Sequence, residues 1–294
     1  MIIDRLFDNV SKNGCVCLGL DTSPAYIPED FSRGFATDAD AVFAFNKKII
    51  DATADVVACY KAQIAYYEAL GLAGLEAYKK TLAYVKSVGQ ISIADVKRGD
   101  ISATAEMYAR AHFTGDFEAD FVTLNPYLGL DSLEPYERYF ASGEKGCFVL
   151  LRTSNPGAKD IQYLDTADGR KVYEVVAEKI QSFGEKYIGA RGYSAVGAVM
   201  GATNREEGRR LREMCGTTFL LIPGFGAQGG TAGDVALYLQ DGNGGVANSS
   251  RGILTAYKKI DGGGEKFAEC ARTEAVEMNE KIRGAVNENH FEPR

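Results

Sequence analysis

The chain has 294 residues, of which 46% are hydrophobic and 25% charged, and its formal net charge is −7. This composition is typical of a globular protein with a substantial core, and the length accommodates one large α/β domain or two smaller ones. The negative charge, without any Lys/Arg-rich run, argues against nucleic acid as the main partner.

The N-terminus predicts an amphipathic helix rather than a signal peptide, because acidic residues fall within the first turns of MIIDRLFDNVSKNG. No apolar run approaches the roughly 18 residues that a membrane span needs. Six cysteines are scattered without a CxxC pair, and the chain has only two histidines. Reduced core thiols are therefore favoured over a zinc site or disulfides, and we expect a cytoplasmic protein without a membrane partner.

Short apolar runs bounded by turn residues alternate with amphipathic stretches along the chain. Such alternation implies parallel βαβ units, and eight units of about 30 residues or more fit a closed (β/α)8 barrel, the TIM barrel, here with an added N-terminal helix. The predicted strands are Cys15–Leu20, Val56–Tyr60, Ile91–Asp95, Phe121–Leu124, Cys147–Leu151, Ala195–Met200, Thr218–Ile222 and Gly245–Ala247. Helical periodicity is clear in Ala41–Ala54, Gly74–Val88, Ile101–Phe113 and Lys171–Phe183.

A doubly wound open sheet is the alternative architecture, but no GxGxxG motif follows the first predicted strand. No linker rich in Gly, Ser or Pro divides the chain, so residues 1–294 are predicted to form a single domain. Thr22–Thr37 is the longest irregular loop in this interpretation, and Asn287–Arg294 is a polar tail.

The most informative motif is DVKRGD, residues 95–100, which closes the third apolar run. Asp95 and Lys97 are two residues apart on a strand and share one face, and Asp100 follows where the chain can turn back over that face. Neighbouring carboxylates would hold the lysine protonated, as a proton donor and cation rather than a nucleophile. A solvated ion pair in a loop is the alternative interpretation.

Two further charges end neighbouring strands: Asp21 follows the first and Lys61 the second. Functional residues of such barrels gather at the C-terminal ends of the strands, so we expect these charges to converge with Asp95 and Lys97. Each taken singly is explained equally well as a cap or a surface residue. A metal held by Asp95 and Asp100 is disfavoured, because the two lysines would repel it.

A phosphate site is predicted after the last two strands, where barrels most often hold one. Residues 223–230, PGFGAQGG, contain four glycines that let backbone N–H groups face one ligand, and Gln228 is able to bridge phosphate and base. Arg251 begins a predicted helix after the eighth strand. An ordinary surface loop is the alternative. After strand five, Ser154 and Asn155 are able to bind a heterocycle edge, although a capped turn explains them nearly as well.

The chain resembles the orotidine 5′-phosphate decarboxylase family, in its longer bacterial-type branch, over nearly its whole length. The motifs that carry the resemblance are LGLD at 18–21, YKAQIAYYE at 60–68, DVKRGDI at 95–101, TSNPG at 153–157, PGFGAQGG at 223–230 and NSSRGI at 248–253. The DxKxxD element alone is shared with sugar-phosphate decarboxylases and hexulose-phosphate aldolases. Those relatives carry an acidic metal ligand at the end of strand two, where this chain has Lys61.

The resemblance implies that Lys97 protonates the pyrimidine carbon that loses carbon dioxide, and that Asp95 lies against the departing carboxylate. It also implies that Asp100 and Thr104 reach into a partner subunit's site, so that the active form is a homodimer, and that no cofactor or metal takes part. In the remaining roles Asp21 and Lys61 contact the ribose, Ser154 the pyrimidine, and Gln228 and Arg251 the phosphate. The loop containing Pro223 and Gly229, which complete the predicted substrate-binding set, would close over the nucleotide.

The departures from the family pattern are small: Ser102-Ala103 replaces a common Gly-Ser, and residues 226–234 contain no tyrosine. The predicted function is cofactor-free decarboxylation of orotidine 5′-phosphate to uridine 5′-phosphate, the last step of de novo UMP synthesis. The alternatives are a metal-dependent sugar-phosphate decarboxylase or aldolase on the same barrel, and a catalytically silent nucleotide-binding protein.

Overall fold

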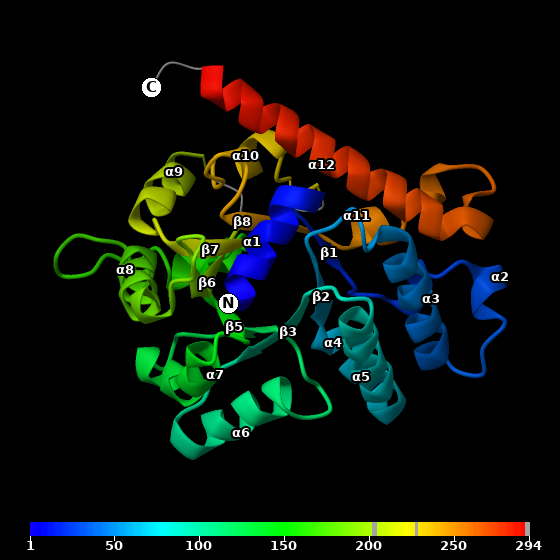
Figure 1. Cartoon of the computed structure of the whole chain (residues 1–294), viewed down its shortest axis with the longest axis horizontal. Coiled ribbons are helices and arrows are strands. Elements are labelled where there is room, and N and C mark those ends of the chain that lie inside the picture. Colours follow the sequence, from blue (N-terminus) through cyan, green and yellow to red (C-terminus); the bar gives the residue numbers. More distant parts are fainter. Residues whose placement is uncertain (202–204, 227–228, 292–294) are drawn as a thin grey trace.

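The computed structural model describes residues 1–201, 205–226 and 229–291, and within them eight parallel strands close into a barrel in the order β1 to β8 (Figure 1). Each strand pairs with the next, and β8 pairs with β1. The strands are β1 Val16–Gly19, β2 Cys59–Gln63, β3 Ser92–Arg98, β4 Phe121–Leu124, β5 Gly146–Arg152, β6 Ser194–Met200, β7 Thr218–Pro223 and β8 Gly245–Ser249.

Helices surround the barrel, and α12 runs along its outside next to α3 and α10 (Figure 1). The predicted (β/α)8 fold with an N-terminal helix is therefore confirmed. The α-helices are α1 Ile2–Asn13, α2 Glu29–Ser32, α3 Asp38–Thr53, α4 Ile64–Glu68, α5 Gly71–Ser87, α6 Ser102–Phe113, α7 Glu137–Ala141, α8 Val172–Gly184, α9 Arg205–Met214, α10 Ala232–Ala236, α11 Arg251–Leu254 and α12 Phe267–Phe291. Short 3₁₀ helices are η1 Pro24–Tyr26, η2 Leu130–Tyr136, η3 Pro156–Asp160, η4 Glu185–Tyr187, η5 Ala256–Lys259 and η6 Gly263–Lys266.

The predictions for the second and third strands differ most from the structure, and both differences concern the site. The second strand was expected at Val56–Tyr60 but begins at Cys59, because the carbonyl groups of Val57 and Ala58 accept hydrogen bonds from asparagine side chains of α1. The third was expected to end at Asp95 but continues to Arg98. Lys97 therefore belongs to the strand itself.

Two segments expected to be irregular contain helix. The predicted loop Thr22–Thr37 includes η1 and α2; Ser23 caps η1, and Pro24 at its first position has a backbone angle suited to a helix start. The predicted polar tail Asn287–Arg294 is a continuation of α12 as far as Phe291. Residues 292–294 lie outside the described part of the chain.

Helix α1 covers the end of the barrel where the strands begin (Figure 1). The side chains of Asn9 and Asn13 donate hydrogen bonds to the backbone carbonyls that precede β2. At two other strands, Ile2 N donates to Gly143 O before β5, and the side chain of Asn243, before β8, donates to Phe7 O. The apolar face of the helix is buried on the strands, as its periodicity predicts. This end is therefore closed, and the opposite end is left for a site.

Inside the barrel, aromatic rings fill space that neighbouring glycines leave open. Phe121 and Phe148 lie with ring centroids 5.2 Å apart. A Cβ atom added to Gly146 would lie 2.4 Å from the Phe121 ring, and one on Gly197 would lie 2.7 Å from the Phe148 ring. These glycines let two large rings pack in the interior, where each buried ring contributes about 2–3 kcal/mol.

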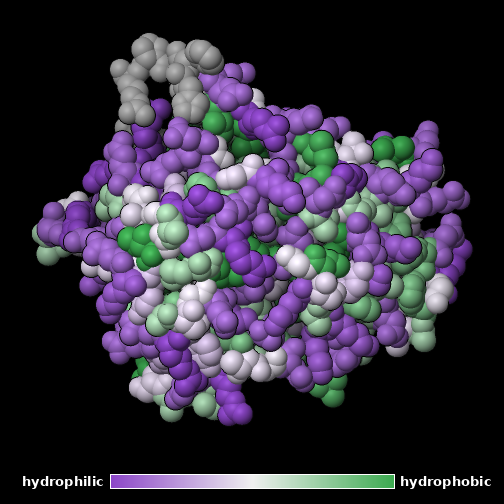
Figure 2. All heavy atoms as spheres, viewed as in Figure 1, coloured by the Kyte–Doolittle hydropathy of each residue, from purple (hydrophilic) through white to green (hydrophobic). Residues whose placement is uncertain are grey.

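The face of the molecule that carries α1 is predominantly hydrophilic, and hydrophobic residues occur on it in small separate groups (Figure 2). None of the helices in residues 1–201, 205–226 and 229–291 is both long and apolar enough to cross a bilayer. All six cysteines are buried and carry free thiols, as the scattered spacing predicts.

One buried asparagine joins the C-terminal helix to the start of the barrel. The side-chain amide of Asn279 in α12 donates to Asn13 O and Val56 O, both at 2.9 Å, and its oxygen accepts from Val16 N at 3.1 Å. Without it, three backbone groups in a buried place would lose their partners.

We predict that Asn279→Ala lowers the free energy of unfolding by about 2–4 kcal/mol, since each lost hydrogen bond of this kind is worth roughly 1 kcal/mol. Urea denaturation followed by circular dichroism measures the change. The exposed Asn287 on the same helix is the matched control, and Asn287→Ala should stay within about 0.5 kcal/mol of wild type. Equal effects of the two substitutions would contradict the role assigned to Asn279.

Candidate active site

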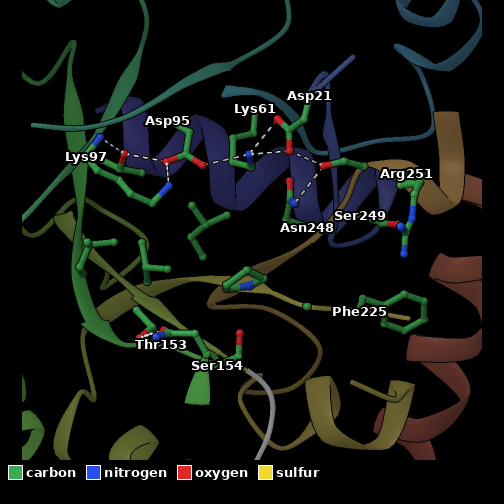
Figure 3. A pocket seen from close by; sticks show the side chains of 18 of the residues that line it. Asp21, Lys61, Asp95, Lys97, Thr153, Ser154, Phe225, Asn248, Ser249 and Arg251 are labelled. Atoms are coloured by element: carbon green, nitrogen blue, oxygen red, sulfur yellow. Dashed lines mark hydrogen bonds and ion pairs between the residues drawn. The ribbon is translucent and has the colours of Figure 1, made fainter. Parts of the chain in front are cut away.

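A cavity of about 720 Å³ opens where the strands end (Figure 3). Its volume is in the range of pockets that hold a small molecule. Asp21, Lys61, Asp95 and Lys97 lie along one side, and side chains from β5, β6, β7 and the segments that follow β5 and β7 lie opposite. The polar set is Asp21, Lys61, Asp95, Lys97, Thr123, Thr153, Ser154, Asn155, Asn248, Ser249, Ser250 and Arg251, and the apolar set is Leu150, Val199, Leu221, Pro223 and Phe225.

Four charges from the ends of three successive strands form one continuous chain (Figure 3). Lys61 Nζ lies 3.1 Å from Asp21 Oδ1 and 3.0 Å from Asp95 Oδ2. Lys97 Nζ lies 2.7 Å from Asp95 Oδ1. The order is therefore carboxylate, ammonium, carboxylate, ammonium. We call these four residues the charge array.

Strand register explains why these side chains meet. Lys61 is paired with Gly19 of β1 on one side and with Ile93 of β3 on the other. Asp21 and Asp95 each lie two residues further along, and residues two apart on a strand face the same side. Both carboxylates therefore project over the Lys61 side chain from its two neighbouring strands.

The two central groups of the array, Lys61 and Asp95, stay charged because the attraction between them offsets the cost of burying each charge. Burial alone would raise the pKa of Asp95, but the ammonium groups of Lys61 and Lys97 outweigh it and lower the pKa from 3.8 to about 2. Burial alone would lower the pKa of Lys61, but Asp21 and Asp95 raise it above its ordinary value. At neutral pH both groups are ionised in the pocket.

Exposure differs along the array. The side chain of Lys61 is 6% exposed, whereas that of Lys97 is 46% exposed, so the ammonium of Lys97 is open to the cavity. Lys97 also has a backbone φ of 45°, in the left-handed region that residues other than glycine rarely adopt. Such a conformation costs about 1–3 kcal/mol and persists only where neighbouring groups enforce it.

Asp21 is held in place from both sides. The carbonyl of Leu20 accepts from Tyr67 Oη at 2.9 Å, and Thr22 Oγ1 donates to Asn46 Oδ1 at 2.6 Å. Asn46 in turn donates to Tyr67 Oη at 2.9 Å, so one buried network anchors both neighbours of Asp21 to α3 and α4. The carboxylate is thereby fixed before any ligand binds.

The array extends beyond Asp21 to the end of β8. Ser250 Oγ donates to Asp21 Oδ2 at 2.7 Å, and Asn248 Nδ2 donates to Ser250 Oγ at 3.4 Å. A Cβ atom on Gly19 would lie 1.9 Å from Ser250 Oγ, so the close approach requires glycine at that position. The array is thus joined to the residue that precedes Arg251.

Ser154 lies in the cavity wall opposite the array, in a loop held from outside the pocket (Figure 3). Gln162 accepts from Thr153 N at 2.9 Å and donates to Thr153 Oγ1 at 2.7 Å. Arg152, at the end of β5, is 1% exposed and pairs with Glu207 of α9 at 3.1 Å. The two residues that precede Ser154 are therefore held in place.

Of the residues predicted to bind phosphate, Arg251 and Pro223 line the cavity. In the loop after β7, Gly226 N donates to Gly230 O, and Gly229 N donates to Gly226 O. In this arrangement these N–H groups bond within the loop and do not face a ligand. Gly229, with φ of 85°, is not among the described lining residues, and Gln228 lies outside the described part of the chain.

Asp100 and Thr104 are not among the described residues that line this cavity. Asp100 Oδ1 accepts a hydrogen bond from Ile101 N at 2.8 Å, and Thr104 is exposed on α6. The idea that Asp100 turns back over the face of Asp95 and Lys97 therefore does not describe this chain taken alone. The remaining predicted residues, Asp21, Lys61, Asp95, Lys97 and Ser154, do lie around one cavity.

Comparison with known proteins gives concordant results. Residues 15–261 match the model of the orotidine 5′-phosphate decarboxylase / HUMPS family. The orotidine 5′-phosphate decarboxylase of Clostridium perfringens is 60% identical over 97% of this chain and 99% of that relative, and that of Clostridium acetobutylicum is 62% identical over 96% and 99%. The chain belongs to this family.

Among solved structures, Leishmania donovani OMP decarboxylase is similar with a TM-score of 0.75 and 31% identity, over 97% of this chain and 98% of that one. The family resemblance that the motifs indicate is therefore confirmed over nearly the whole chain. The TIM barrel and its strand order agree with that assignment.

Sequence reasoning missed several residues of this decarboxylase-family pocket. Thr123 of β4 contacts Asp95, and its place next to the end of the predicted strand Phe121–Leu124 is the one signal that could have pointed to it. Tyr26 at the end of η1 and Tyr66 of α4 also line the cavity. Ser250 was grouped with the phosphate motif, but its hydroxyl bonds Asp21.

We predict that Lys61→Met lowers the free energy of unfolding at pH 7 by about 3–5 kcal/mol, since it leaves two largely buried carboxylates without the cation between them. The deficit should shrink as the pH falls. In wild type, the Asp95 contribution is present above pH 3.8 and is lost toward pH 2. In the variant the pKa of Asp95 is raised, so protonation relieves the repulsion.

Urea denaturation at pH 7 and at pH 5 tests this prediction. The matched control is Lys47→Met, since Lys47 forms an exposed pair with Asp51 and should change stability by at most about 1 kcal/mol. A Lys61→Met deficit that is small or independent of pH would show that the array does not depend on this lysine.

Proposed function

We propose that this chain catalyses the decarboxylation of orotidine 5′-phosphate to uridine 5′-phosphate as one domain, residues 1–294, without a metal or organic cofactor. The observation that carries the proposal is the charge array along one wall of the cavity, with the ammonium of Lys97 exposed to the open space. Family membership indicates the substrate. The charge array provides the cation and the proton donor that decarboxylation of this substrate requires.

The cavity divides into regions that suit the parts of the nucleotide. Ser154 lies in the wall opposite the array, where its hydroxyl suits the edge of the pyrimidine. Arg251 lies at the β8 side and offers a guanidinium to the phosphate. Asp21 and Lys61 lie between these regions along the array, where they suit the ribose hydroxyls. Gln228, Gly229 and Pro223 belong to the loop that we propose closes over the phosphate.

The reaction needs charge stabilisation and one proton. The bond between C6 and the carboxylate carbon breaks, carbon dioxide leaves, and the electron pair remains on C6 in an orbital that the ring does not delocalise. Lys97 Nζ then gives a proton to C6, forming the C–H bond, and water restores the lysine proton afterwards. One positioned ammonium both stabilises the developing carbanion and supplies the proton.

Asp95 determines where that ammonium lies. Its Oδ1 accepts from Lys97 Nζ and its Oδ2 from Lys61 Nζ, so the carboxylate is fixed by two cations before substrate arrives. Preorganisation of this kind removes the cost of reorienting charges during the reaction. We propose that the substrate carboxylate lies beside Asp95 and leaves from there.

We predict that the purified protein converts orotidine 5′-phosphate to uridine 5′-phosphate in the presence of excess EDTA, as followed by the loss of the substrate's ultraviolet absorbance. Lys97→Ala should lower kcat by about 10²–10⁴-fold or more, because it removes the proton donor. Binding of uridine 5′-phosphate, measured by calorimetry, should remain. The exposed Lys186 provides the control, since Lys186→Ala should leave kcat unchanged.

Retained turnover in Lys97→Ala would contradict the mechanism. No turnover by the folded wild-type protein would contradict the function, and sugar phosphates with added magnesium would then be tested.

We propose further that the active form is a homodimer in which Asp100 and Thr104 complete the partner's pocket. Both lie outside the cavity of their own chain and beside exposed apolar side chains. Asn125 N donates to Arg98 O at 2.7 Å, which brings the loop after β4 next to the segment that contains Asp100. The exposed apolar residues there are Ile101, Met107, Tyr127 and Leu128. A group of this kind is typical of a protein interface.

We predict that mixing Lys97→Ala and Asp100→Ala chains, each inactive alone, restores about a quarter of the wild-type activity. About half of the dimers are then hybrids, and each hybrid has one complete site. Mixing Lys97→Ala with Asp95→Ala is the control and should restore nothing, since both residues serve the same subunit's site. Equal results from the two mixtures, with subunit exchange shown by native mass spectrometry, would contradict a shared site.

A further inference from the structure

The backbone of β3 is irregular at the position of the charge array. Its pairing with β4 moves from Ala94 opposite Val122 to Arg98 opposite Leu124, so residues 95–97 together face the single residue Thr123. This is a β-bulge. A bulge changes the direction in which side chains point, and it leaves some backbone groups without a hydrogen-bond partner on the neighbouring strand. The residues in the bulge include both Asp95 and Lys97.

The hydroxyl of Thr123 takes up the groups that the bulge leaves unpaired. Thr123 Oγ1 accepts from Val96 N at 3.0 Å and from Lys97 N at 2.9 Å. It donates its proton to Asp95 Oδ1 at 2.9 Å, the same oxygen that accepts from Lys97 Nζ. One hydroxyl thus contacts both the carboxylate and the backbone of the lysine, and the side chain of Thr123 is buried.

We propose that Thr123 is a positioning residue for the decarboxylation, whose hydroxyl holds Asp95 and the left-handed backbone of Lys97 in the arrangement that places the Lys97 ammonium in the pocket. A hydroxyl has one proton to donate and two lone pairs, and all three are in use. Thr123 therefore has no capacity left for substrate, although it lines the cavity, and it acts through its two neighbours. The inference rests on the proposed function.

The backbone of Lys97 makes this support necessary. At φ of 45° the residue is in a conformation that is unfavourable for a side chain with a Cβ atom. Arg98, the next residue, has its guanidinium carbon 4.9 Å from the Tyr108 ring centroid, outside the barrel. The bulge thus sends Lys97 into the pocket and Arg98 away from it, and the two bonds to Thr123 Oγ1 oppose relaxation to an ordinary strand.

The test compares variants that keep or lose the hydroxyl. Thr123→Val preserves shape and removes the hydroxyl, and we expect kcat to fall by about 10–100-fold, because small misplacements of reacting groups have effects of this size. KM and the Kd for uridine 5′-phosphate should change by less than about threefold, since few contacts to the nucleotide are lost. Thr123→Ser keeps the hydroxyl and should retain kcat within about threefold.

Thr218→Val is the matched control, because Thr218 is an equally buried barrel-strand threonine whose hydroxyl bonds Gln181 outside the pocket. It should leave kcat within about threefold of wild type at a comparable loss of Tm. A wild-type kcat in Thr123→Val, or a Thr123→Ser variant as slow as Thr123→Val, would overturn the proposal.

Thr123→Ala is the second hydroxyl-free variant. If both hydroxyl-free variants fail to fold while Thr123→Ser is active, the hydroxyl serves the fold as a whole and the positioning role is wrong. A crystal structure of Thr123→Val separates this inference from the proposed function: we expect Lys97 to leave the left-handed region and its Nζ to move away from Asp95. An unchanged Lys97 would contradict the positioning role even if the wild-type protein acted on another substrate.

Discussion

The site depends on the ammonium of Lys61, which lies between two carboxylates that would otherwise repel each other. Asp21 and Asp95 approach from the two sides of β2, and Lys61 of β2 supplies the cation that offsets their repulsion. Because Lys61 is 6% exposed, that cation is a fixed part of the structure rather than a mobile surface charge. The register of β1, β2 and β3 places the side chains of Asp21, Lys61 and Asp95 on the same side of the barrel. Strand pairing and charge attraction therefore favour the same positions for these three side chains.

The charge array has support at both ends from hydroxyl groups. At one end Ser250 bonds Asp21 and connects the array to the segment that carries Arg251. At the other end Thr123 bonds Asp95 and the bulged backbone of β3. A continuous set of hydrogen bonds and ion pairs therefore runs from the region proposed to transfer the proton to Ser250, the residue that precedes Arg251. Such continuity lets binding of a remote group contribute to orientation at the reacting carbon.

The two ends of the barrel have different roles. Where the strands begin, α1 and Asn279 of α12 satisfy backbone groups and close the interior, which is a matter of stability. Where the strands end, charged side chains remain with an open cavity above them, and Lys97 keeps an unfavourable backbone angle. Strain and buried charge are tolerated at this end because the rest of the barrel is closely packed. Asp100 belongs to neither region of its own chain, which is why a partner subunit enters the proposal.

The sequence alone determined the barrel, since apolar runs alternating with helical periodicity leave few other architectures for eight βαβ units. It also placed Asp21, Lys61, Asp95 and Lys97 at strand ends, because their positions follow from the period of a strand and the end of each apolar run. Only the tertiary structure decided how β3 ends, since a bulge depends on what the neighbouring strand offers, here the hydroxyl of Thr123. It likewise decided that Ser250 faces Asp21 and that Asp100 lies outside its own pocket. These contacts join residues far apart in the chain, and no local pattern encodes which hydroxyl will lie beside which carboxylate.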